Sequence, residues 1–150
     1  MIVATGETSP VPSIHIWSIV NLEPFKVIQT FHRDGIQHLK FSNDGVFLIS
    51  ISVDTFFSIQ VINWKTEETV VFRNTGTFPI FDVLFNPYNK YEFTTVGPHN
   101  ITIWELQGRS LTRKNWIHLK GVSEEDSNKS DKSVPKIITT AAYLNYHVNL

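Results

Sequence analysis

Four residues include the types of a catalytic triad: His32, Ser50, Ser52 and Asp54. In hydrolases of that kind a histidine accepts the proton of a serine nucleophile, and an aspartate orients the imidazole. The sequence has no Gly-x-Ser-x-Gly motif of the kind that exposes such a serine on a sharp turn. A propeller hydrolase would also need convergent carboxylates, which the sequence does not supply. We therefore expect no enzymatic activity from these residues.

Metal and cofactor chemistry also lacks its usual motifs. The chain contains no cysteine, no His-Glu-x-x-His pair and no glycine-rich phosphate loop. None of its six histidines has a ligand spacing typical of a metal site. We predict no metal and no cofactor. The histidines are His15, His32, His38, His99, His118 and His147.

One compact basic cluster, Arg109, Arg113 and Lys114, could contact an acidic partner surface. The alternative for these side chains is a solvated loop. The formal net charge of −1 argues against a nucleic-acid protein, because such proteins neutralise phosphates with a basic excess. No apolar run approaches the ~20 residues that span a bilayer. Nucleic acid and membrane are therefore not expected partners.

The composition predicts strands as the elements that position these residues. Ile, Val and Thr total 44 residues, whereas Ala and Leu total 12, and 19 residues are aromatic. Side chains branched at Cβ favour a pleated strand, while Ala and Leu favour helices. We therefore predict an all-β fold. Strands are predicted at 2–5, 14–18, 26–31, 58–63, 69–73, 80–85, 92–96, 100–105, 115–119 and 136–143.

A further pair of strands is predicted as a hairpin over residues 36–53. From Phe47 to Val53 apolar residues alternate with their neighbours, and a period of two is typical of a strand. The preceding Asp44-Gly45 is typical of a tight turn in which both residues have positive φ.

An internal repeat distinguishes a propeller from a sandwich. The segment from Ile36 to Asp44 matches the segment from Ile80 to Tyr88, so that Phe41 aligns with Phe85. Trp17, Ile62 and Trp104 occupy equivalent positions in three successive units. A period of ~40–45 residues with four strands in each unit is typical of propeller blades.

The segment from His32 to Gly45 resembles the WD-repeat pattern, with a histidine, spaced aliphatic residues and Phe-Ser-Asn-Asp-Gly. The sequence departs from that pattern because Gly76 replaces one histidine, Ile62 replaces one tryptophan and no tryptophan is followed by aspartate. The resemblance implies that a His, a Ser or Thr, an Asp and a Trp form a structural hydrogen-bond network in each blade. That network would be incomplete beside Ile62. The structural blade positions implied are His32, Phe41, Asp54, Trp17, Phe85 and Trp104, and Trp17 and Trp104 are expected to pack buried between blades.

Three segments are similar to a narrower group, the echinoderm microtubule-associated-protein-like family. They are Val3-Ala-Thr-Gly6 with Ile14 to Trp17, Val61 to Lys65, and Trp104 to Lys114. The resemblance implies a binding module for tubulin, microtubules or neighbouring axonemal proteins, located in the cytoplasm, the cytoskeleton or the axoneme of a cilium. Large ciliary and flagellar WD-repeat proteins share such degenerate blades. A WD-repeat scaffold of a non-cytoskeletal complex is the alternative.

The predicted organisation is about three blades with roughly twelve antiparallel strands. It comprises a partial blade of three strands at 1–31, blades at 32–75 and 76–120, a polar loop insertion at 121–135, and the start of a next blade at 136–150. Propellers close with 4–8 blades. We therefore expect a segment of a larger or tandem propeller, with the remaining blades of the same protein as partners.

Overall fold

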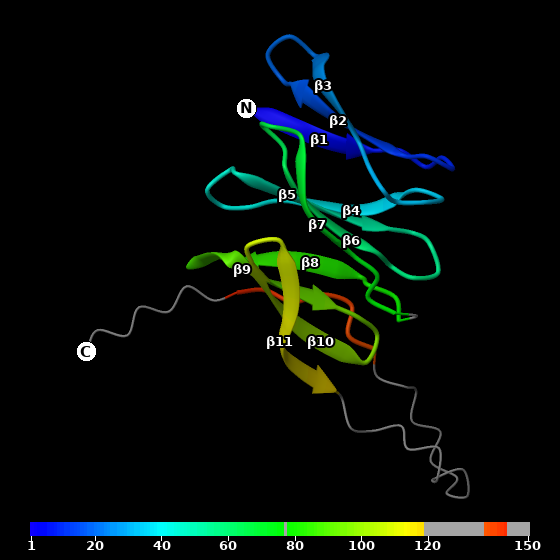
Figure 1. The fold of residues 1–150 in the computed structure, drawn as a ribbon, viewed down its shortest axis with the longest axis vertical. Coiled ribbons are helices and arrows are strands. Elements are labelled where there is room, and N and C mark those ends of the chain that lie inside the picture. The colour runs from blue at the N-terminus through cyan, green and yellow to red at the C-terminus, as the bar shows by residue number, and fades with distance from the viewer. Residues whose placement is uncertain (77, 119–136, 144–150) are drawn as a thin grey trace, which may run out of the picture.

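The computed structural model describes residues 1–76, 78–118 and 137–143, and within them the chain forms eleven strands and no helix. The strands make three antiparallel sheets that are stacked in chain order (Figure 1). The predicted all-β fold of about three blades is confirmed.

Each sheet is a meander in which consecutive strands pair. The first sheet contains β1 (Ile2–Gly6), β2 (Ser13–Ser18) and β3 (Glu23–Gln29). The second contains β4 (Ile36–Phe41), β5 (Phe47–Ser52), β6 (Ile59–Asn63) and β7 (Glu68–Arg73). The third contains β8 (Asp82–Asn86), β9 (Asn89–Val96), β10 (Asn100–Gln107) and β11 (Ser110–His118).

Two predictions about the strands and turns need correction. The strand predicted at 136–143 is wrong over its described part, because residues 137–143 form no strand. Asp44-Gly45 does join β4 to β5, but only Gly45 has a positive φ, of 66°. The loop between these two strands runs from Ser42 to Val46. Within it, the Ser42 hydroxyl and the Asp44 carboxylate both accept hydrogen bonds from the Val46 backbone N–H. The loop predicted at 121–135 lies outside the described residues.

Buried isoleucines form much of the apolar layers between the sheets. Ile14, Ile16 and Ile28 of the first sheet pack with Leu48 and Ile62 of the second. The opposite face of the second sheet contributes four apolar residues to a layer shared with the third sheet. Fully burying one such side chain contributes about 1.5–3 kcal/mol. The four residues of the second sheet that face the third sheet are Ile49, Ile51, Ile59 and Val61.

The same β-bulge recurs in all three sheets and shows which of their residues are equivalent. The register against the outer strand shifts just before Trp17, Ile62 and Trp104. Each of these residues lies opposite a residue of the inner neighbouring strand, and those partners are Val3, Leu48 and Phe93. A β-bulge inserts one residue into one strand and re-aims the side chains around it. The predicted equivalence of Trp17, Ile62 and Trp104 is therefore confirmed by the strand register.

Candidate functional site

The triad-type residues predicted from the sequence do meet, inside the second sheet. His32 Nε2 lies 2.7 Å from Ser50 Oγ, and its Nδ1 lies 2.8 Å from Ser58 Oγ. The Ser58 hydroxyl in turn lies 2.9 Å from Ser52 Oγ and 3.3 Å from Asp54 Oδ2. Ser58 was missed as a site residue from the sequence, although it is the first residue of the strand predicted at 58–63 and lies beside Ser52 at the end of β5.

This cluster is enclosed rather than open to substrate. His32 is 3% exposed, and Ser50, Ser52 and Ser58 are fully buried. Burial lowers the pKa of His32 to about 4, while the nearby Asp54 carboxylate opposes that shift. The imidazole is therefore neutral at pH 7, with one nitrogen donating and the other accepting. Such an arrangement ties the β3–β4 linker to β5 and to Ser58, directly before β6, and offers no accessible nucleophile.

The tryptophan part of the network is present in the other two sheets. The Trp104 indole donates to Thr95 Oγ1 and the Trp17 indole donates to Thr5 Oγ1, each over 2.8 Å. By strand register Thr5, Ser50 and Thr95 are equivalent positions. The second sheet thus keeps the histidine without the tryptophan, and the third keeps the tryptophan without the histidine.

The predicted aromatic positions differ in burial. Trp104 and Phe85 are buried, as is Phe93, which packs against Phe85 with ring centroids 6.0 Å apart. Trp17 is only half-buried, so its predicted burial between blades is wrong. Trp17 belongs to neither of the apolar layers between the described sheets. Figure 1 shows the first sheet at the end of the stack, with a neighbouring sheet on one side only.

The second sheet holds one further aromatic pair near its outer end. Phe41 packs edge to face against Trp64, with ring centroids 5.7 Å apart. The Trp64 indole donates to the Gly45 carbonyl over 2.9 Å. Trp64 therefore ties the end of β6 to the β4–β5 turn.

The predicted basic cluster lies on β11 and the turn before it, but its members take three different directions. Arg109 pairs with Glu68 of the second sheet. The guanidinium of Arg113 lies 5.5 Å from the centre of the Trp104 ring, on the face toward the second sheet. Lys114 lies on the opposite face, 2.8 Å from Glu92 Oε2 and 3.7 Å from Glu105 Oε1. These three cations therefore do not form one continuous basic patch.

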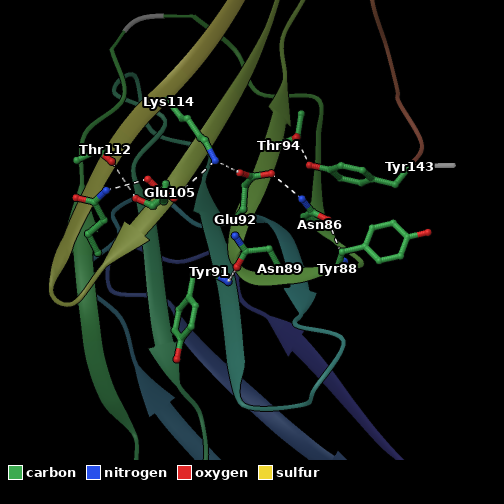
Figure 2. Close-up of polar contacts among 11 residues, drawn as sticks. Asn86, Tyr88, Asn89, Tyr91, Glu92, Thr94, Glu105, Thr112, Lys114 and Tyr143 are labelled. Atoms are coloured by element: carbon green, nitrogen blue, oxygen red, sulfur yellow. Dashed lines mark hydrogen bonds and ion pairs between the residues drawn. The ribbon is translucent and has the colours of Figure 1, made fainter. Parts of the chain in front are cut away.

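Figure 2 shows Lys114 and Glu92 within a polar network on the outer face of the third sheet. Glu92 also accepts a hydrogen bond from the Asn86 amide over 2.6 Å. The hydrogen bond from Lys114 is the main cause that holds the pKa of Glu92 below its ordinary range. The basic cluster in the sequence does not reveal that Glu92 and Glu105 lie beside Lys114. These two carboxylates come close to Lys114 only because β9, β10 and β11 pair in one sheet.

Segment 137–143 lies against the same outer face. Ile138 N donates to the Pro98 carbonyl over 2.9 Å, and Thr140 Oγ1 donates to Asp82 Oδ2 over 2.8 Å. The Tyr143 hydroxyl and Thr94 Oγ1 are 2.5 Å apart (Figure 2). This segment therefore covers part of the third sheet without adding a strand to it.

Two kinds of site are not found in the described part of the chain. No group of three or more His, Cys, Asp or Glu side chains there could hold a metal ion. In residues 1–76, 78–118 and 137–143 there is no helix long and apolar enough to cross a membrane.

Comparison with known proteins found related sequences but no matching family model. Cilia- and flagella-associated protein 44 of Mus musculus is 27% identical over 103 residues, which are 69% of this chain. Echinoderm microtubule-associated protein-like 4 of Mus musculus is 30% identical over 127 residues, or 77% of the chain. Cilia- and flagella-associated protein 251 of Tetrahymena thermophila is 30% identical over 117 residues, or 71% of the chain. The chain spans 6%, 13% and 12% of the lengths of these relatives.

Solved structures with the same fold are β-propellers. The Cps50 (Swd1) β-propeller domain of Myceliophteria thermophila aligns with a TM-score of 0.64 and 14% identity, over 83% of this chain and 37% of that one. A chain of the mitotic checkpoint complex aligns with a TM-score of 0.63 and 18% identity, over 77% of this chain and 36% of that one. The three sheets are therefore blades of a partial propeller.

Proposed function

We propose that this chain, a segment of a WD-repeat β-propeller, is a non-enzymatic protein-interaction module that acts at microtubules or at the axoneme of a cilium. The observation that carries the proposal is the sequence similarity to a microtubule-associated and two cilia- and flagella-associated proteins. Each alignment covers more than two thirds of this chain, so the similarity extends beyond a single blade.

The proposed mechanism is binding through a rigid surface. The apolar layers between the sheets fix the blades relative to one another, and the loops and edge strands then present side chains to a partner. Contacts spread over such a surface give affinity without chemistry. The enclosed His32 cluster agrees with this mechanism, because its hydroxyls are not accessible to a substrate.

The proposed contact surface includes the outer edge strand β11. It carries Arg113 and Lys114, and Arg109 lies in the turn before it. Tubulin, or a neighbouring axonemal protein, is the proposed partner. Because Arg109 and Lys114 are paired within the chain, binding to an acidic surface would exchange those ion pairs for contacts with the partner.

Co-sedimentation tests this proposal on the native protein. An antibody raised against the chain detects that protein in lysates of ciliated cells, before and after polymerised microtubules are pelleted. We expect the protein to pellet with microtubules and to remain in the supernatant when polymerisation is blocked. Recovery in a soluble, non-cytoskeletal complex under both conditions would contradict the proposal and favour a general WD-repeat scaffold.

A further inference from the structure

The first sheet lacks an inner strand that the other two sheets have. The shared β-bulge makes β1 the equivalent of β5 and β9. In the second and third sheets these strands pair on their inner side with β4 and β8. Among the described residues, no strand pairs with β1 on that side. An unpaired edge of this kind presents backbone N–H and C=O groups that can bind a further strand.

Segment 137–143 has the residue spacing of an inner strand. In such a strand an isoleucine is followed by an aliphatic residue three positions later and by an aromatic residue five positions later. The segment nevertheless belongs to none of the three sheets. The three sets with this spacing are Ile36, Leu39 and Phe41 at β4, Ile80, Val83 and Phe85 at β8, and Ile138, Ala141 and Tyr143 in the segment.

The segment also starts where an inner strand starts. Ile36 N, at the beginning of β4, donates over 2.9 Å to the Glu7 carbonyl in the loop after β1. Ile138 N donates over 2.9 Å to the Pro98 carbonyl in the loop after β9, the strand equivalent to β1. Segment 137–143 therefore has the place of an inner strand in a fourth blade, without the sheet that would pair with it.

The first sheet has, in addition, a partly exposed face with apolar residues. Trp17 is half-buried and Val3, which lies opposite it, is 44% exposed. Neither residue belongs to the apolar layers between the described sheets. The equivalent residues Ile62 and Trp104 do belong to these layers, where each packs against the preceding sheet. The first sheet thus presents the face that a preceding blade would cover.

The outer face of the third sheet offers the other half of such a contact. Ile101 and Ile103 are half-buried there, at the positions that Ile59 and Val61 have in the second sheet. Ile59 and Val61 are the residues that the third sheet covers. The first and third sheets, at the two ends of the stack (Figure 1), therefore present the two kinds of face that pack against each other between neighbouring blades.

We propose that a second copy of this chain binds both faces, so that segment 137–143 of each copy becomes the inner strand of the other copy's first blade. A separate peptide could pair with the edge of β1, but it would leave both apolar faces uncovered. A second copy fills the edge and covers the faces at once. The inference does not depend on the microtubule proposal, since it rests on strand order and on the two faces alone.

The number of blades agrees with a closed ring of two copies. The eleven strands of one chain and the added segment make three four-stranded blades. Two copies then make six blades, and propellers close with 4–8 blades. A head-to-tail contact whose rotation closes gives a ring, whereas one that does not close gives a filament.

The equivalent positions fix the register of the new strand pair. β4 places Lys40 opposite Ile49, and β8 places Leu84 opposite Thr94. At the same position, Ala142 of one copy should lie opposite Ala4 of the other. Opposite residues of antiparallel strands have Cα atoms about 4.5–5.5 Å apart, a separation that a disulfide can bridge.

Disulfide cross-linking tests this register, because the chain has no cysteine of its own. Ala4→Cys and Ala142→Cys are made in separate chains, which are then mixed in a glutathione buffer. We expect a covalent dimer, with a disulfide between positions 4 and 142 identified by mass spectrometry. The matched control mixes Ala4→Cys with Ala141→Cys, because a shift of one residue moves the thiol to the other face of the strand. The control mixture should give no such dimer, and equal cross-linking in both mixtures would overturn the proposal.

Sedimentation equilibrium measures the assembly itself. The 150-residue chain of 17.2 kDa should sediment with twice that mass at micromolar concentration. A chain shortened to residues 1–136 should sediment as a monomer, and circular dichroism establishes that it keeps its β-sheet spectrum. A monomeric parent chain would overturn the proposal and assign the edge of β1 to a further blade of the same protein. Assemblies larger than a dimer, or a shortened chain that still dimerises, would also contradict it.

Discussion

The Trp104 indole donates a 2.8 Å hydrogen bond to Thr95 inside the third blade, and this pair is the buried counterpart of Trp17 and Thr5 in the first blade. Trp104 is 2% exposed and lies between two sheets, whereas Trp17 is half-buried and belongs to neither of the apolar layers between the described sheets. The same hydrogen bond therefore exists in a buried and in a half-buried environment within one chain. Matched substitutions can then measure how burial changes its contribution to stability.

Trp104→Phe should destabilise the chain by about 2–3 kcal/mol, because the smaller ring leaves both a gap and an unpaired Thr95 hydroxyl. Trp17→Phe should cost less than about 1 kcal/mol, since water can reach its Thr5 partner. Urea denaturation followed by circular dichroism measures both free energies of unfolding. Equal costs for the two substitutions would contradict the assignment of Trp104 to the layer between the blades.

The pH dependence of stability should carry a contribution from His32. Its pKa is about 4 in the folded chain and 6.5 ordinarily, so between these values the unfolded chain binds a proton that the folded chain does not. The free energy of unfolding therefore falls as the pH falls through this window, by at most about 1.4 kcal/mol per pH unit. His32→Gln should lower stability at pH 7 by about 1–3 kcal/mol and flatten the curve between pH 6.5 and 4. Parallel curves for the parent chain and the variant would show that His32 is not the group that titrates.

Gly6 lies at the contact between β1 of the first blade and β4 of the second blade. A Cβ added there would lie 2.7 Å from both Cβ and Cγ2 of Ile36. Gly6→Ala should therefore destabilise the chain by about 1–3 kcal/mol, as expected for overpacking. Ile36→Ala removes Cγ2 and should cost less in the Gly6→Ala background than alone, with a coupling of about 0.5 kcal/mol or more in a double-mutant cycle measured by urea denaturation. Additive costs would place the two blades farther apart than described.

Lys114 should control the titration of Glu92. Because its hydrogen bond is the main cause of the lowered pKa of Glu92, Lys114→Gln should raise that pKa toward the ordinary value of 4.5. Stability contributed by this carboxylate is present above 4.5 and is lost as the pH falls through its folded pKa, so the variant should lose less stability in acid. Side-chain NMR titration measures the shift. Arg109→Gln serves as the control and should leave the pKa of Glu92 unchanged, and a shift of equal size in both variants would contradict the pairing.

Much of the fold follows from local patterns in the sequence. Period-two runs such as Phe47 to Val53 indicate strands whatever their neighbours are, and the repeat places Trp17, Ile62 and Trp104 at one position. The segment at 137–143 misled the prediction because its β-branched residues are typical of strands. It packs instead against the side of a completed sheet, and strand propensity alone does not tell which backbone a segment will pair with.

The contacts within the candidate site depend on packing that local patterns do not encode. The ion pair of Arg109 with Glu68 joins two different blades, so no spacing within one hairpin predicts it. The burial of Trp17 was overestimated for the same reason, because it depends on what covers its sheet.

The location of the native protein in a ciliated cell tests the central claim most directly. Immunofluorescence with an antibody against this chain should give a signal along the axoneme or along cytoplasmic microtubules, and depolymerising those microtubules should disperse the cytoplasmic signal. A signal confined to structures without microtubules, unchanged by depolymerisation, would contradict a role at the cytoskeleton.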